Sequence, residues 1–154
     1  MFQFLRDELW VVFTAAAPVA ELRASIPLAH SLGMSALKAF VLSVIGNMFP
    51  VPIILAVLWY FEKQLRALPV IGNILEWFIR RTMAKTDQIQ RYGPIGLALF
   101  VAIPLPSTGA WTGSLAAFLL RIKSRYAIPS IFLGVVLAGI IVTALTQGIS
   151  SLIP

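Results

Sequence analysis

The stretch IPLPSTGAWTG, residues 103–113, interrupts an apolar segment that carries no charged side chain from Tyr92 to Leu120. Proline removes a backbone N–H that a helix needs, and glycine tolerates the conformations of a turn. Pro104, Pro106 and Gly109 all lie near the middle of the segment. We therefore expect two helical arms joined by a turn rather than one uninterrupted helix.

The rest of the chain has the composition of an integral membrane protein. Of its 154 residues, 59% are hydrophobic and 12% are charged, whereas soluble domains carry about 25% charged residues. A helix needs roughly 20 apolar residues to cross a bilayer. Residues 39–61 and 126–154 each supply that length without a charged side chain. The chain is predicted to be a single all-α membrane domain, residues 1–154.

Basic residues gather in the segments 62–91 and 121–125, and both segments are net positive. Because basic loops stay on the cytoplasmic side, both are predicted to be cytoplasmic in the cell membrane of a prokaryote. One crossing between them would place them on opposite sides. A hairpin that enters and leaves on the same side removes this conflict, so residues 92–120 are predicted to be a re-entrant helix–turn–helix.

The N-terminal part of the chain has a similar organisation. PVAELRASIP, residues 18–27, places a glutamate and an arginine between two prolines, and the apolar runs 9–20 and 25–37 are each too short to cross. We expect a second re-entrant hairpin with a polar tip bounded by Pro18 and Pro27. Its outer end would carry Arg6, Asp7, Glu8 and Lys38.

The two predicted hairpins share a short sequence motif. IPLAHSLGMSALKAF (26–40) and IPLPSTGAWTGSLAAF (103–118) both begin with IPL and end on similar residues. Since one crossing follows each hairpin, residues 5–61 and 92–154 are predicted to form an inverted repeat, an architecture found in transporters. The connector 62–91 is predicted to carry an amphipathic helix, residues 73–93, on the cytoplasmic membrane surface.

Glu21 and Arg23 form the one acid–base pair inside a predicted membrane hairpin. Charges within a membrane are costly and mark functional sites by default. Glu21 is predicted to bind and release a proton, and Arg23 to bind an anionic headgroup; the alternative is a structural pair that pins the tip. Residues two apart do not share a helix face. Either the tip is irregular, or each side chain has a different partner.

The tip of the second hairpin offers hydroxyl groups and backbone amides. Helix N-termini bind anions, but a polar tip can also serve only to satisfy its own backbone, and both interpretations stay open. Asn47, beside Gly46 and Pro50, is predicted to face the same cavity, with a hydrogen bond between helices as the alternative. The full set of candidates on this tip is Pro104, Pro106, Ser107, Thr108, Gly109, Trp111 and Thr112.

Several functions lack the residues they would need. The chain has no cysteine and a single histidine, so we expect no thiol chemistry, no metal site and no cofactor. It also has no motif of a serine hydrolase, a zinc protease or a nucleotide-binding loop, and we do not expect an enzyme. The net charge of +6 is assigned to membrane topology rather than to nucleic acid.

The chain resembles the small multidrug export family of bacterial and archaeal membrane proteins over nearly its whole length. This family is similar to the larger DedA, or VTT, superfamily. That resemblance implies paired re-entrant hairpins and proton-coupled translocation of lipid phosphates such as undecaprenyl phosphate. The stretches that carry it are ELRASIPLA (21–29), IGNMFPVPIIL (45–55), RYGPIGLALFVAIPLPSTGAWTG (91–113) and FLGVVLAGIIVTAL (132–145).

One departure from the DedA pattern affects the expected site. DedA proteins place arginines around the proline of the second hairpin, where this chain has Ala102 and Ser107. Arg23, or Arg91 at the mouth of the hairpin, would then supply the positive charge.

The resulting prediction is a proton-linked translocase of a lipid phosphate, with membrane lipids as partners. The alternatives are a small multidrug/proton antiporter, in which Glu21 binds a lipophilic cation, and a membrane scaffold that transports nothing. A homodimer would help so few helices to enclose a cavity.

Overall fold

A computed structural model describes residues 2–62, 93–104 and 108–152, and these residues form helices and turns. The all-α class predicted from the sequence is confirmed for this part of the chain. The predicted connector helix falls almost wholly outside it. The helices are α1 (Phe2–Ala16), α2 (Glu21–Ser31), α3 (Ala36–Met48), α4 (Pro50–Tyr60), α8 (Pro94–Ala102), α9 (Ala110–Leu119) and α10 (Ser124–Leu152).

Two stretches of helix are long and apolar enough to cross a membrane. They are Ala36–Tyr60, which joins α3 and α4 across a break at Phe49, and Ser124–Ile149 of α10. At 1.5 Å per residue both exceed the roughly 30 Å of a bilayer's hydrocarbon core. Large apolar side chains on both are exposed, including Ile45 at 57% and Leu133 at 56%. Water solvates such surfaces poorly, whereas lipid does so readily.

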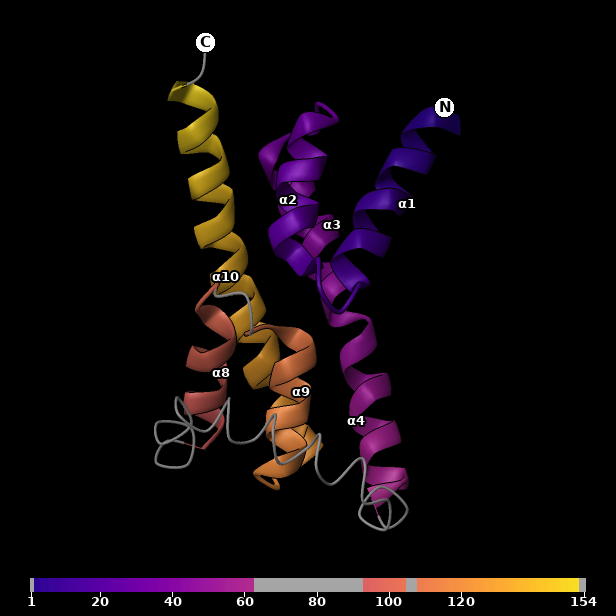
Figure 1. Cartoon of the computed structure of the whole chain (residues 1–154), viewed down its shortest axis with the longest axis vertical. Helices are drawn as coiled ribbons and strands as arrows, with labels where there is room; N and C mark the ends of the chain where they lie inside the picture. Colours follow the sequence, from indigo (N-terminus) through magenta and orange to yellow (C-terminus); the bar gives the residue numbers. More distant parts are fainter. Residues whose placement is uncertain (1, 63–92, 105–107, 153–154) are drawn as a thin grey trace.

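Two helical hairpins lie in opposite halves of the molecule. Figure 1 shows α1 and α2 in the half that holds both chain ends, and α8 and α9 in the other half, with the turns of both hairpins near the middle. The arms have 15, 11, 9 and 10 residues, which makes each about 14–22 Å long. None of the four arms could cross a bilayer alone. The second turn lies where the prolines and glycines of IPLPSTGAWTG predicted it.

The first arm of each hairpin packs against a glycine of the long helix that follows it. A Cβ atom on Gly46 of α3 would lie 2.6 Å from the carbonyl oxygen of Val12 in α1. A Cβ on Gly134 of α10 would lie 2.6 Å from the carbonyl oxygen of Ala98 in α8. Because interiors are close-packed, any side chain at these positions would push two backbones apart. The two halves therefore use the same kind of contact.

The IPL motifs, in contrast, occupy different places in the two hairpins. Ile26 and Pro27 lie inside α2, whereas Ile103 and Pro104 lie in the turn between α8 and α9. The sequence match between residues 26–40 and 103–118 is therefore wrong as an alignment of the hairpins. A short apolar motif fits either position, because both a buried arm and a buried turn need apolar side chains.

The prediction that Pro18 and Pro27 bound the tip of the first hairpin was also wrong, because Pro27 does not lie in the turn. The first turn covers residues 17–20, and Glu21 already begins α2, so Pro27 lies in the helix interior. Proline removes a single helical hydrogen bond, the one to the carbonyl four residues earlier. The packing of α2 against α1 and α3 holds the helix together across that missing bond.

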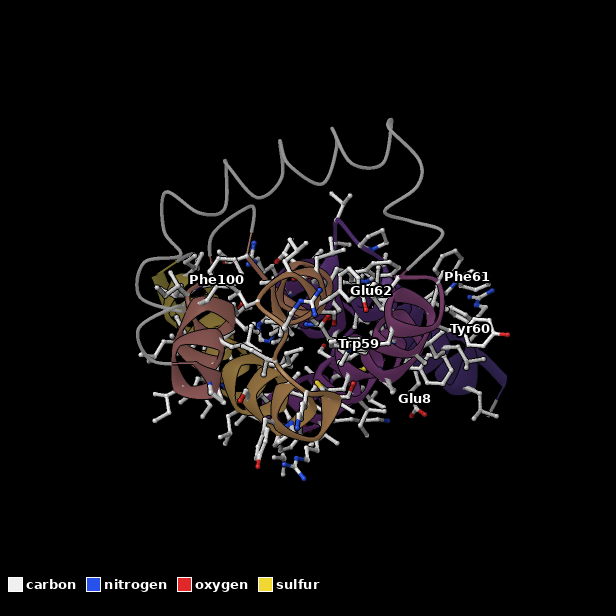
Figure 2. All side chains as sticks on the ribbon, turned by 90° about the horizontal axis from the view of Figure 1, so that it is seen from below. Glu8, Trp59, Tyr60, Phe61, Glu62 and Phe100 are labelled. Atoms are coloured by element: carbon white, nitrogen blue, oxygen red, sulfur yellow. The ribbon has the colours of Figure 1, made fainter. Side chains whose placement is uncertain are left out.

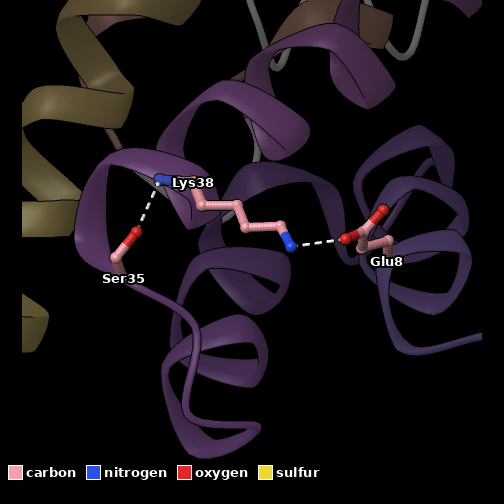
Figure 3. Close-up of polar contacts among 3 residues, drawn as sticks. All are labelled: Glu8, Ser35 and Lys38. Carbon is pink, nitrogen blue, oxygen red and sulfur yellow. Dashed lines mark hydrogen bonds and ion pairs between the residues drawn. The ribbon is translucent and has the colours of Figure 1, made fainter. Parts of the chain in front are cut away.

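Ion pairs mark the two ends of the molecule. At the end of the first hairpin, Lys38 of α3 pairs with Glu8 of α1, and the Ser35 hydroxyl accepts a 3.4 Å hydrogen bond from the Lys38 amide (Figure 3). This brings together two of the charged residues predicted for that end. Pairs this exposed contribute about 0–1 kcal/mol each, so they orient the helix ends more than they stabilise the fold.

At the opposite end, the beginnings of the two basic segments meet. A guanidinium nitrogen of Arg121 lies 3.4 Å from a carboxylate oxygen of Glu62. Trp59 of α4 packs edge-on against Phe118 of α9, with ring centroids 5.4 Å apart, and Figure 2 shows Trp59 and Glu62 on the side of α4 that faces α9. These contacts place Glu62 and Arg121 at the same end of the molecule.

Candidate functional site

The turns of the two hairpins touch each other in the middle of the molecule. We call this the tip contact; it consists of Glu21 and Arg23 from the first turn of α2, and Thr108, Gly109 and Trp111 at the start of α9. The indole N–H of Trp111 also donates a 3.0 Å hydrogen bond to the carbonyl of Ala16, the last residue of α1. The sequence predicted these five residues as candidates, and the structure brings all five together.

Glu21 places its carboxylate on the N-terminus of α9. Its Oε1 atom accepts a hydrogen bond from the Trp111 amide at 3.5 Å, and the Ala110 amide also donates to this carboxylate. A Cβ atom on Gly109 would overlap the carboxylate, so glycine leaves the space that Glu21 occupies. The N-cap residue of α9 is Gly109, which has no side chain to cap the helix. Glu21 therefore caps it from the other hairpin, where a negative charge complements the helix dipole.

The backbone of Glu21 is strained as well as buried. Its φ angle is +49°, a left-handed conformation that residues other than glycine rarely adopt. The residue as a whole is only 6% exposed. Such conformations are destabilising by about 1–3 kcal/mol and persist where the surroundings enforce them, often at functional sites. The strain and the burial both concentrate at the residue that joins the two hairpins.

Arg23 reaches the second hairpin through a different residue. Its guanidinium donates to the carbonyl oxygen of Thr108, and also to the Thr108 hydroxyl at 3.1 Å. The Thr108 hydroxyl donates in turn to the carbonyl of Ile103 across the turn. Within the described residues, no ion pair joins Glu21 to Arg23. Of the two alternatives that the sequence left open, the structure confirms the second: each charged side chain has its own partner.

The remaining candidates that the structure describes do not belong to the tip contact. The Thr112 hydroxyl donates to the carbonyl of Gly109 at 3.2 Å, within its own turn, and Pro104 is half-buried at the end of α8. Asn47 is fully buried in α3, and neither its amide nitrogen nor its oxygen has a protein partner in the described part of the chain. The hydrogen bond between helices expected as its alternative role is therefore wrong. Pro106, Ser107 and Arg91 lie outside the described residues.

Sequence reasoning missed the backbone carbonyls that complete the contact. The carbonyls of Ala16 and Ile103 accept hydrogen bonds from Trp111 and Thr108. The last carbonyls of any helix lack partners inside it, so the end of α1 was a place to look for an acceptor. The sequence could not say that a tryptophan from the other hairpin would reach it.

The tip contact has the chemistry of an anion site that the protein's own carboxylate fills. Two backbone amides at a helix N-terminus attract negative charge. A guanidinium group, which pairs well with carboxylate and phosphate, lies close by on Arg23. Both groups are buried or half-buried, which strengthens their electrostatic interactions relative to water.

The family described as "putative small multi-drug export protein" matches residues 21–141. This match extends over most of the chain. The protein belongs to that family. No curated protein and no solved structure matches the chain.

Membership in the small multi-drug export family points to a membrane export protein, in agreement with the two helices of crossing length. The matched region begins at Glu21 and ends inside α10. It contains every residue of the tip contact, while α1 (Phe2–Ala16) lies before it. The bonds that Glu21 and Arg23 make to the second hairpin thus lie within the part of the chain that defines the family, whereas Ala16, which accepts from Trp111, lies before it.

Proposed function

We propose that this member of the small multi-drug export family is a proton-linked translocase of a lipid phosphate, built like the DedA superfamily from two re-entrant hairpins in an inverted repeat. The observation that carries the proposal is the position of Glu21, whose carboxylate lies on the amides at the N-terminus of α9. A phosphate headgroup has the same charge sign and accepts hydrogen bonds from the same donors.

The lengths and positions of the arms support re-entry. Each arm of either hairpin is shorter than a bilayer's hydrocarbon core, and the turns lie midway along the molecule (Figure 1). Backbone at that depth must be satisfied by protein rather than lipid. Each turn here receives hydrogen bonds from the other hairpin. In this proposal, segments 62–91 and 121–125 lie on the cytoplasmic side.

Proton binding and headgroup binding are linked because the ionised Glu21 carboxylate and a phosphate compete for the same amides. When Glu21 takes up a proton, it loses the charge that holds it on α9, and the Ala110 and Trp111 amides become available. A phosphate then accepts hydrogen bonds from these amides and from Arg23. When the phosphate leaves on the other side, Glu21 loses its proton and returns to α9. Arg23 balances one negative charge in both states.

The experiment is translocation of a polyprenyl phosphate in liposomes, followed as the fraction of phosphate accessible from outside. We expect wild-type protein to accelerate translocation in a manner that depends on a pH gradient. Glu21→Gln should lose the dependence on the gradient, and Arg23→Ala should lose most of the rate. Glu8→Gln, an acid at the outer end of α1, is the matched control and should behave as wild type. If liposomes with wild-type protein translocate the polyprenyl phosphate no faster than protein-free liposomes, this proposal is wrong.

The partner molecules can be identified in the same preparation. Native mass spectrometry from lipid nanodiscs should find an anionic lipid that stays bound to wild-type protein and is lost from Arg23→Ala. The same spectra give the number of chains. A homodimer is part of the proposal, because two hairpins and two crossings enclose little volume.

A small multidrug/proton antiporter is the second candidate, and the description of the family as a small multi-drug export protein favours it. Glu21 would then bind a lipophilic cation in exchange for protons. Arg23, two residues away, opposes a cation at that place. Proteoliposomes with an outward proton gradient that take up a cationic dye, but do not move polyprenyl phosphate, would favour the antiporter.

A membrane scaffold is the third candidate. Both charged side chains have partners across the two hairpins, as a structural clamp requires. A scaffold predicts that Glu21→Gln and Arg23→Ala lower stability, with no transport in wild type for them to remove. Translocation by wild type that these variants reduce while remaining folded would exclude it.

A further inference from the structure

Three polar side chains on α2 and α3 are fully buried. Ser25, Ser43 and Asn47 are each 0% exposed. Within the described residues, the two hydroxyl oxygens and both polar atoms of the Asn47 amide have no hydrogen-bond partner. Buried polar groups almost always have a partner, either in the protein or in a bound water or ion. These three side chains are therefore candidates to bind a water molecule or an ion.

The packing of the two helices places these residues at matching levels. Ala29 of α2 and Ala39 of α3 belong to one apolar cluster with Val11, and α2 and α3 run in opposite directions after a short turn (Figure 1). Residues four apart lie on the same face of a helix. One turn toward the middle, Ser25 is therefore level with Ser43. Two turns along, Glu21 is level with Asn47. We call Ser25, Ser43 and Asn47 the polar column.

Two other hydroxyls behave differently, although the buried Thr143 hydroxyl of α10 also lacks a partner in the described part of the chain. The Ser114 hydroxyl donates to the carbonyl of Ala110 at 2.8 Å, and the Thr146 hydroxyl donates to the carbonyl of Val142 at 2.8 Å. Both satisfy themselves on their own helix, four residues back, as buried hydroxyls commonly do. Ser25 and Ser43 have no such bond, so their oxygens remain available to a ligand.

The backbone beside Asn47 adds further oxygen atoms. Pro50 and Pro52 have no N–H, so the carbonyls of Gly46 and Met48 lose the donors that a helix would give them. These carbonyls belong to the residues on either side of Asn47, at the break between α3 and α4. In transporters with broken helices, freed carbonyls and side-chain oxygens coordinate sodium ions. The polar column therefore lies where such an ion would find several oxygen ligands.

We propose that the polar column binds one sodium ion. Hydroxyl, amide and carbonyl oxygens are hard ligands of the kind that alkali and alkaline-earth cations take. Helix geometry puts Glu21 at the level of Asn47, and its single negative charge suits a monovalent ion better than a divalent one. The Arg23 guanidinium is held on Thr108 of the other hairpin. Sodium binding does not depend on the proposed lipid substrate.

The test is thermal unfolding of the purified full-length chain in nanodiscs, followed by tryptophan fluorescence. Sodium chloride replaces choline chloride at constant ionic strength, with potassium chloride as a parallel series. We expect a saturable rise in Tm of about 5 °C or more when sodium reaches about 100 times its dissociation constant. Ser43→Ala and Asn47→Ala should lose this rise. Ser114→Ala, whose hydroxyl bonds to its own helix, should keep it.

Direct binding of radioactive sodium keeps the test decisive if those variants fail to fold. Wild type should bind one sodium ion per chain, and Ser25→Ala should bind at least tenfold more weakly. The proposal is wrong if sodium and choline change the wild-type Tm equally, or if folded Ser25→Ala binds sodium as tightly as wild type. Either result would indicate that the polar column binds only water. An equal response to sodium and potassium overturns the assignment to sodium. Sodium binding without lipid translocation would support this site while the proposed function fails.

Discussion

The two hairpins have similar shapes but contribute opposite kinds of polar group to the contact between them. The first contributes charged side chains, Glu21 and Arg23, from the start of α2. The second contributes backbone amides, a backbone carbonyl and the hydroxyl of Thr108. Neither turn satisfies these groups alone. A polar contact in the middle of a membrane protein can thus be divided between two hairpins, each of which supplies the hydrogen-bond partners that the other lacks.

Gly109→Val should have the largest effect, because it removes the space in which the halves meet. Gly109 has an extended backbone with φ of 165°, which valine also adopts, so any loss reflects the collision with the Glu21 carboxylate. Forcing a buried carboxylate off its donors should lower the free energy of unfolding by about 3 kcal/mol or more. Chemical unfolding in detergent measures this.

A variant of the neighbouring Thr112 gives the control for that experiment. Thr112→Val removes a hydroxyl that bonds only within its own turn and should lower stability by about 1 kcal/mol or less. Equal stability of Gly109→Val and wild type would show that the two turns do not need to touch.

Arg23→Ala should have the next largest effect. It removes the donor of two hydrogen bonds from the first hairpin to Thr108, and bonds to charged groups contribute about 1.5–3 kcal/mol. Arg23→Lys keeps the charge but loses the forked geometry, so it should recover only part of the loss. Arg6→Ala, at the exposed outer end, should leave thermal stability unchanged. Full recovery by lysine would mean that charge alone joins the hairpins.

Gly46→Ala and Gly134→Ala test whether the two halves are packed alike. Each added methyl group would meet a backbone carbonyl of the adjoining arm, and overpacking of this kind is destabilising by about 1–3 kcal/mol. Gly148→Ala, with open space around it, should be neutral or slightly stabilising. Unfolding of all three in the same detergent gives the comparison, and a loss confined to one half would break the similarity between them.

Trp111→Phe should have the smallest effect. It keeps an aromatic ring but loses the indole N–H that donates to Ala16 at 3.0 Å. The Ala16 carbonyl then loses one partner, which should lower stability by about 1 kcal/mol. Thermal unfolding measures the shift, and Trp10→Phe, on the exposed face of α1, is the control. An identical shift in both variants would mean that the end of α1 does not rely on the second hairpin.

The sequence predicted much of this arrangement for identifiable reasons. The lengths of the apolar runs predicted both helices of crossing length, and the prolines and glycine of residues 103–109 predicted the second turn. Glu21 and Arg23 stood out because charges are rare in apolar segments. The IPL motif misaligned the hairpins, because apolar residues with one proline fit many helical environments. The exact start of α2 was missed because the packing of neighbouring helices, rather than the position of Pro27, decides it.

By itself, the sequence determined where the chain can stay in lipid, where it must turn and which side chains are costly to bury. These depend on composition and local backbone chemistry, which are written residue by residue. The packing of the helices, in contrast, decided that Glu21 caps α9, that Arg23 bonds to Thr108, and that Ser25, Ser43 and Asn47 are buried without a protein partner in the described part of the chain. Such contacts join residues far apart in the chain, and their partners are fixed by how the helices pack rather than by any local pattern.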